Sequence, residues 1–284
     1  MKGLLFVIPA LAVYTFVVGY PMIMTFFYSF TDWKMGRKPE FIGLENYAHM
    51  FDSSEWVVWQ AVKNNLLWMV LMIVVNVSLA LIVSGLLRNV NPKVMKVLRV
   101  IFYLPVILPR TVVCRIWMWL YNPIVGLQPV LDKLNIPFLG LGDPDTVMYA
   151  IAVVGVWCWW GFPLVILLSS LQQIDPVYYE AASIEGAGKA TLFAKITVPM
   201  LRPTLIFILV LTMVTSFQIF DLNYIMTWGG PGKASEVLAT LIYKNGILQF
   251  QAGYGSALAV LQMLLSSIGI AAYMYLQRKE LETV

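Results

Sequence analysis

The sequence predicts an all-α integral membrane protein, with six transmembrane helices in a single domain that covers residues 1–284. Hydrophobic residues make up 60% of the chain and charged residues only 12%. A typical soluble domain is about half apolar and about a quarter charged, and one soluble core could not bury the surplus. The apolar residues also gather in six runs, each long enough for a helix to cross roughly 30 Å of hydrocarbon.

The predicted spans are residues 3–31, 64–87, 100–121, 147–172, 204–228 and 254–277. The first run carries no charge, is too long for a signal peptide and has no small-x-small cleavage site after it, so we expect a permanent span. The third run is the weakest, because it contains Arg110 and Arg115.

Basic residues set the predicted orientation. The loop 88–99 has four basic residues and no acid, whereas the loop 122–146 has one lysine against three aspartates. The first loop is therefore expected in the cytoplasm and the second outside, with both termini cytoplasmic. The loop 32–63 blurs this pattern, since it has four basic and five acidic residues.

Composition and spacing argue against several functions. The net charge of +4 is spread along the chain, without the dense basic patch that nucleic-acid binding needs. Cys114 and Cys158 match no metal or redox spacing. The single histidine, His49, lies in a polar loop and is interpreted as structural. We therefore expect no catalytic residues and no metal site.

The polar segment 173–203, between the fourth and fifth runs, is predicted to form a helix-turn-helix in the cytoplasm. Asp175 can cap a first short helix that begins at Pro176, and glycines at 186 and 188 break that helix. A second short helix is predicted over 189–196 and is expected to stop before Pro199. Its apolar residues Leu192, Phe193 and Ile196 share one face. Such an element suits docking to a partner, although a well-folded connecting loop is the alternative.

This segment resembles the EAA motif of the permeases of binding-protein-dependent ABC importers. That motif reads EAA, three residues, glycine, nine residues, isoleucine, any residue, leucine and proline. The matching positions are Glu180, Ala181, Ala182, Gly186, Ile196 and Pro199. Val198 stands where the motif has leucine, which is a conservative change. The segments FDLNYIMTWGGP, LPVILPR and WLYNP are similar to carbohydrate-type permeases, so the resemblance covers nearly the whole chain.

The resemblance implies a type I ABC importer permease fold, in which residues 173–203 couple the permease mechanically to an ATPase. Glu180 would pair with a basic group of the ATPase, and Gly186 would form the bend between the coupling helices. Ile196 and Pro199 would seat and terminate the second helix. A rigid helix gripped in a cleft can convert ATPase closure into rotation of membrane helices.

The implied partners are a second homologous permease subunit, a homodimer of ATPase subunits, an extracytoplasmic solute-binding protein and a sugar or oligosaccharide. The chain would lie in the lipid bilayer of a bacterial or archaeal cytoplasmic (inner) membrane. ATP and Mg would bind the ATPase, and this chain would hold no cofactor. Although Gly186 to Thr191 superficially resembles a phosphate-binding loop, Ser183 and Ala190 stand where that loop needs glycine and Ser or Thr.

Two spans carry candidate substrate-binding residues. The fourth has aromatic and glycine residues near its middle, and indole rings suit the C–H face of a sugar; an interfacial aromatic belt is the alternative. The fifth has a stripe of hydroxyls that could bond a sugar or neighbouring helices. By analogy with maltose-type permeases, the pocket residues are Trp159, Trp160, Gly161, Thr212, Thr215 and Ser216. Arg110, Arg115 and Asp221 are interpreted as structural.

Three other functions compete with sugar import by an ABC permease. An ABC permease for a glycerol phosphate ester would need cations in the pocket, for which Arg110 or Arg115 would have to serve. An ion-coupled secondary sugar carrier would need acidic or histidine residues at membrane depth, where only Asp221 is available. An intramembrane enzyme would need a nucleophile–base pair or metal ligands in the spans, which the sequence does not offer.

Overall fold

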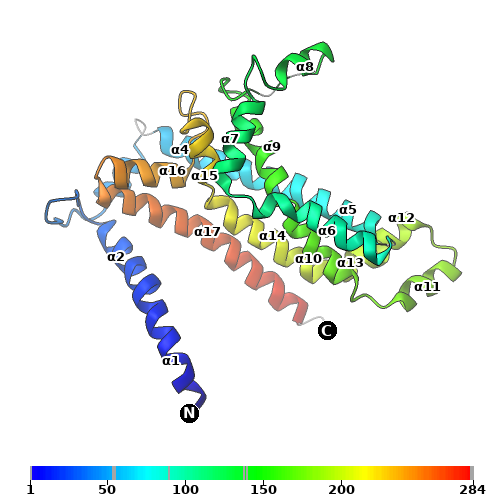
Figure 1. Ribbon diagram of the computed structural model, residues 1–284. Coiled ribbons are helices and arrows are strands. Elements are labelled where there is room, and N and C mark those ends of the chain that lie inside the picture. Colours follow the sequence, from blue (N-terminus) through cyan, green and yellow to red (C-terminus); the bar gives the residue numbers. More distant parts are fainter. Residues whose placement is uncertain (1, 53–55, 89, 137, 139, 282–284) are drawn as a thin grey trace.

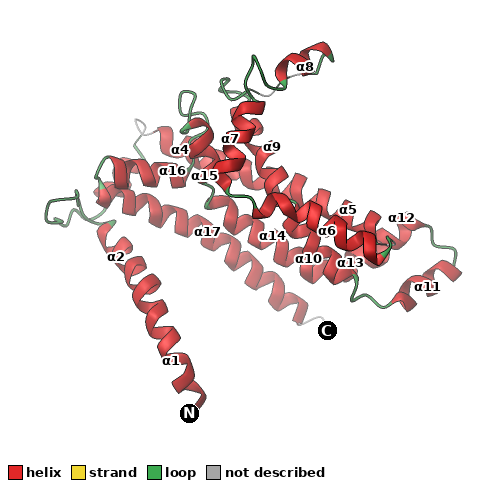
Figure 2. Ribbon diagram, viewed as in Figure 1, coloured by secondary structure: helices red, strands yellow, loops and turns green. Residues whose placement is uncertain are grey.

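The protein is built from helices and the turns that join them (Figures 1 and 2). The computed structural model describes residues 2–52, 56–88, 90–136, 138 and 140–281, and within these ranges the only β-structure is an isolated bridge between Thr31 and Phe41. The α-helices are α1 (Lys2–Tyr14), α2 (Tyr20–Tyr28), α3 (Glu45–Met50), α4 (Trp56–Leu71), α5 (Ser78–Leu87), α6 (Pro92–Ile107), α7 (Arg110–Leu120), α8 (Gln128–Lys133), α9 (Val147–Trp159), α10 (Gly161–Leu171), α11 (Pro176–Ile184), α12 (Lys189–Leu192), α13 (Val198–Met200), α14 (Arg202–Phe217), α15 (Asp221–Thr227), α16 (Leu238–Tyr243) and α17 (Ala252–Leu281). Wider, π-helical turns cover Thr15–Gly19, Met72–Val77, Phe193–Thr197 and Lys244–Leu248.

The predicted all-α membrane fold is confirmed. Among the described residues, four helices are long and apolar enough to cross a membrane: Phe6–Tyr28, Trp56–Leu87, Val147–Leu171 and Ala252–Ala271. Two bent pairs meet the same criteria together, Pro92–Ile107 with Arg110–Leu120 and Lys189–Met200 with Arg202–Phe217. Each of the six predicted spans overlaps one of these helices or pairs.

The third span is not the single helix that hydropathy predicts. Helices α6 and α7 meet at 91°. Leu108 is extended (φ −64°, ψ 137°) and Pro109 precedes the first residue of α7. Proline lacks the N–H that would continue α6 and disfavours a helical conformation for the residue before it. The bend directs the first turn of α7 toward the centre of the bundle.

The fifth span also differs from the prediction, since it ends at Phe217 and not at Trp228. Gln218 closes α14, and after a short break α15 begins at Asp221. A helix can be interrupted at membrane depth only where other protein groups satisfy its freed backbone atoms. Here the Asn65 amide donates to the Ser216 carbonyl oxygen (3.1 Å).

The second helix of the segment 173–203 runs through Pro199, where the sequence predicted a stop. The π-helical turn Phe193–Thr197 precedes the proline, and the Val198 N–H donates back to the Phe193 carbonyl. Pro199 is the second residue of α13, directly after this turn, and the helical path continues past it. The bend of 68° comes two residues later, between Met200 and Arg202.

The N-terminal helices stand apart from the other spans. Helices α1 and α2 form one rod. The α2 part contacts α17 near the N-terminal end of α17, and the rod then diverges from α17 toward α1 (Figure 1). No residue of the span Phe6–Tyr28 is buried. In the same view α1 and the last turns of α17 point toward the lower part of the picture, α11 lies at the right edge and α8 lies at the top.

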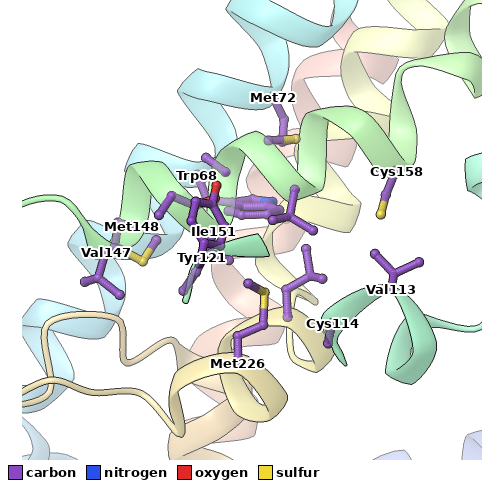
Figure 3. Packing of buried hydrophobic residues seen from close by; sticks show 14 residues of the cluster. Trp68, Met72, Val113, Cys114, Tyr121, Val147, Met148, Ile151, Cys158 and Met226 are labelled. Carbon is purple, nitrogen blue, oxygen red and sulfur yellow. The ribbon is translucent and has the colours of Figure 1, made fainter. Parts of the chain in front are cut away.

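The largest apolar cluster joins α4, α7, α9 and α15 (Figure 3). Ile151 and Cys158 of α9 are almost fully buried, as are Val113 and Cys114 of α7. Trp68 of α4 lies among these side chains and is 4% exposed. Packing of this density fixes the rotation of α4 and α9 relative to each other, and those two helices form one end of the cavity described below.

A polar network holds the segment 228–238 against α4. The Asn64 amide donates to the carbonyl oxygens of Ala234 (2.8 Å) and Glu236 (2.7 Å), and Asn65 Oδ1 accepts from the Leu238 N–H (2.9 Å). The fully buried Glu236 carboxylate accepts from Lys244 Nζ at 2.7 and 2.8 Å. These contacts satisfy the irregular backbone that follows α15.

We predict that Asn65→Leu destabilises the fold. The Ser216 carbonyl and the Leu238 N–H would both lose a buried partner, at a cost of about 1–3 kcal/mol each. The matched control is Asn245→Leu, because among the described residues the Asn245 amide bonds the Leu241 carbonyl of its own helix, one turn away (2.9 Å). Thermal unfolding of the purified variants in detergent should show a clear fall in midpoint for Asn65→Leu alone, and equal midpoints would contradict the prediction.

Candidate functional site

A cavity of about 250 Å³ lies between the middles of two spans and the C-terminal part of α14. Trp68 and Met72 come from the middle of the span Trp56–Leu87, Trp159 from the middle of Val147–Leu171, and Thr212 from α14. The lining residues are Trp68, Met72, Arg110, Gly155, Trp159, Thr212, Thr215, Ser216, Gln218, Ile219, Phe220, Asp221 and Leu222. The cavity is therefore at membrane depth, and both helix breaks open onto it.

Aromatic rings form one side of the cavity. Gly155 has no Cβ, so the Trp68 indole packs directly on the α9 backbone, where any larger residue would collide with the ring. Trp159, one turn further along α9, is partly exposed and stacks on Phe162 with ring centroids 5.0 Å apart. An indole face that remains accessible in a cavity can pack on the C–H groups of a sugar ring.

Hydroxyl groups of α14 form the facing side. Thr212 and Ser216 are buried in the bundle, at 3% and 2% exposure, and Thr215 is half-buried. The Ser216 hydroxyl donates to the Thr212 carbonyl (2.6 Å), and that of Thr215 donates to the Leu211 carbonyl (2.8 Å). With their protons turned to the backbone, both oxygens keep lone pairs that can accept from a ligand.

Two opposite charges line the cavity, although the sequence favoured structural roles for both and suggested Arg110 as a pocket cation only for a phosphate ester. Arg110 is the first residue of α7, and the bend at Pro109 brings it to the cavity. Asp221 is the first residue of α15, and the end of α14 at Phe217 brings it to the same space. Proline at 109 was a signal for the first break, whereas nothing local in the sequence signals the second.

The structure places four of the six predicted pocket residues in this lining: Trp159, Thr212, Thr215 and Ser216. Trp160 and Gly161 lie outside it. The Trp160 ring packs on Phe102 of α6 (centroids 4.9 Å apart), and a Cβ at Gly161 would collide with the Phe102 carbonyl. Their position is explained by close packing of α10 on α6.

The segment 173–203 forms the predicted helix-turn-helix. Asp175 caps α11 by accepting from the Val177 N–H (2.9 Å), as its sequence position indicated. Gly186 has φ +83°, a left-handed conformation that favours glycine, and it turns the chain toward α12. Glu180 and Ala181 are exposed, as are Gly186 and Pro199, while Ala182 and Ile196 are half-buried. The predicted coupling residues therefore include several that a partner can reach.

The exposed surface of α11 is partly apolar. Val177, Tyr178 and Ile184 are exposed by 62%, 55% and 89%. Among the residues that the structure describes, no group of three or more His, Cys, Asp or Glu side chains is arranged to hold a metal ion.

Residues 76–281 match the family model described as binding-protein-dependent transport system inner membrane component. The chain belongs to this family. Among curated proteins, it is 35% identical over 268 residues to the probable ABC transporter permease protein YurN of Bacillus subtilis, covering 92% of this chain and 91% of YurN.

Two other relatives have names that state a substrate. The sulfoquinovosyl glycerol transport system permease protein SmoG of Agrobacterium fabrum is 32% identical, over 98% of this chain and 91% of its own length. The trehalose/maltose transport system permease protein MalF of Thermococcus litoralis is also 32% identical, over 93% of this chain and 89% of its own.

The fold matches that of a solved transporter chain. A crystal structure of a bacterial ABC transporter involved in the import of the acidic polysaccharide alginate superposes with a TM-score of 0.83 at 20% identity, over 98% of this chain and 96% of that chain. The predicted ABC permease fold is therefore confirmed.

We predict that Trp159→Ala impairs transport while preserving the fold, because it removes the accessible indole from the cavity. Loss of roughly 1.4 kcal/mol of ligand contact would lower the uptake rate of the reconstituted transporter about tenfold. Trp157→Ala is the matched control, since Trp157 packs on Trp117 (centroids 5.8 Å apart) and lies outside the lining. Equal uptake by the two variants would argue against the cavity as the ligand site.

Proposed function

We propose that the chain is the membrane-spanning permease subunit of an ATP-driven importer for a sugar or oligosaccharide. The observation that carries this proposal is one physical connection. Helix α14, which supplies the hydroxyl side of the cavity, is joined directly to the helix-turn-helix through a 68° bend at Leu201. A force applied to that element would enter α14 at this bend and reach the cavity along α14.

The chemistry of the lining supports a sugar as the ligand. It combines an indole platform, hydroxyl oxygens, the Gln218 amide and two charged groups. Arg110 can donate to sugar hydroxyls and Asp221 can accept from them. The relatives whose names include trehalose, maltose or a sulfoquinovosyl glycerol support the same class.

Charge balance favours an uncharged sugar over a phosphate ester. The cavity has one cation and one carboxylate, so the formal charges of Arg110 and Asp221 cancel. A site for a doubly charged phosphate is expected to concentrate cations. Arg115, the other arginine considered for that role, is exposed and lies outside the lining.

The size of the cavity supports an assembly of two permeases. Its volume of about 250 Å³ is just below the roughly 300–1,000 Å³ of small-molecule pockets. A second homologous permease subunit would enlarge and close it. An extracytoplasmic binding protein would deliver the sugar. Two ATPase subunits would hold ATP and Mg, and one of them would bind the exposed surface of α11. In this arrangement both termini and residues 173–203 are cytoplasmic, and hydrolysis takes place on the ATPase.

We predict that Glu180→Ala abolishes coupled transport and leaves the permease folded. An exposed carboxylate on the first coupling helix suits a bidentate contact with an arginine of the ATPase. The matched control is Glu185→Ala, because Glu185 is also exposed and stands at the end of the same helix.

The measurement is sugar-dependent ATPase activity and uptake by the complete importer in proteoliposomes. Wild type and Glu185→Ala should show both activities, and Glu180→Ala should lose uptake by at least about tenfold. Normal uptake by Glu180→Ala would refute the coupling role. Uptake that follows an ion gradient without any ATPase would overturn the importer class in favour of a secondary carrier.

A further inference from the structure

The helix-turn-helix also contacts a span to which it is not connected in sequence. Arg88, at the end of α5, lies over the ring of Tyr179 in α11, with Cζ 3.1 Å from the ring centroid. Helices α11–α13 are joined by the chain only to α10 and α14. The Arg88–Tyr179 contact therefore adds a third connection, to the span Trp56–Leu87.

The contact is enclosed by further packing. Tyr179 is only 5% exposed, and its hydroxyl hydrogen-bonds that of Thr197 (3.1 Å) in the second coupling helix. One turn before Arg88, the Phe193 ring lies so close to Gly85 that a Cβ there would be 2.5 Å from the ring. Both helices of the helix-turn-helix thus contact the end of α5. A cation–π pair is strongest where the ring is shielded from water.

The far part of this span reaches the cavity. Trp68 and Met72 line the cavity, and they lie on the same span as Gly85 and Arg88. Gly85 lies thirteen positions after Met72, which corresponds to about 20 Å of helix. Movement of the helix-turn-helix would therefore act on two sides of the cavity, on the hydroxyl side through α14 and on the Trp68 side through α5.

We propose that Arg88 is a positioning residue for transport, which transmits displacement of the coupling element to the Trp68 side of the cavity through its stack on Tyr179. This inference rests on the proposed importer function. Without the contact, ATP hydrolysis at the ATPase would still move α14, but α4 and α5 would follow less closely, because only the Phe193–Gly85 packing would remain. ATP would then be hydrolysed in cycles that transfer no sugar, so the ratio of sugar transported to ATP hydrolysed should fall.

The experiment measures that ratio in the complete importer in proteoliposomes. Arg88→Met removes the charge but keeps a long side chain, and Tyr179→Leu removes the ring. Each should lower the ratio about tenfold while sugar-stimulated ATPase activity stays within about twofold of wild type. The double variant should show no further fall, because both changes remove one contact. Arg88→Lys, which keeps the cation, should restore most of the ratio.

The matched control is Lys96→Met, which removes an exposed cation from the same basic segment. It should leave the ratio unchanged. A proportional fall of uptake and ATPase activity in Arg88→Met, with the ratio constant, would overturn the inference, as would additive effects in the double variant. Failure of Arg88→Met to assemble, with Tyr179→Leu assembling and showing a normal ratio, would also overturn it, since the contact would then serve folding alone. Absence of sugar-stimulated ATPase activity in wild type would instead reject the proposed function.

Discussion

The arrangement of the bundle depends on how the backbone groups freed at its helix interruptions find hydrogen-bond partners away from water. Hydrocarbon offers no hydrogen bonds, so a helix can be interrupted at membrane depth only where protein groups replace the missing partners. Asn65 does this for the end of α14 and for the start of α16, and Asn64 does it for the loop between α15 and α16. Because two neighbouring amides of α4 satisfy the end of α14 and the loop after α15, α14 can stop short and leave room for a cavity lined by Asp221.

How far the sequence predicts each part of this structure depends on whether the residues that determine that part are close together in the chain. Hydropathy is summed over a whole span, so the six membrane segments were predictable. The cap at Asp175 and the bend at Gly186 are local, so the helix-turn-helix was predictable as well. The π-helical turn that carries the chain through Pro199 has no comparable local signal, and the predicted end of that helix was wrong.

The cavity was only partly predictable for the same reason. Trp159 and the hydroxyls of α14 lie on regular helices, where spacing predicts which residues share a face. Arg110 and Asp221 reach the cavity only because helices break beside them. The break after α14 is stabilised by the side-chain amide of Asn65, which is far from it in sequence. Trp160 and Gly161 were assigned to the pocket by analogy with maltose-type permeases, yet in this chain they pack on α6 and lie outside the lining.

The π-helical turn Met72–Val77 lies in the span Trp56–Leu87. Because of this turn, the number of residues in the span is as important as its composition. Such a turn holds one residue more than a regular α-helical turn, and each residue rotates the helix by about 100°. Deleting a single residue there would produce an unbroken α-helix of ordinary apolar composition. It would also rotate the two halves of the span relative to each other. Either Trp68 would then face away from Gly155 or Gly85 would face away from Phe193, so one of the two contacts would be lost. Selection on this segment should therefore tolerate exchanges among apolar side chains far more readily than insertions or deletions.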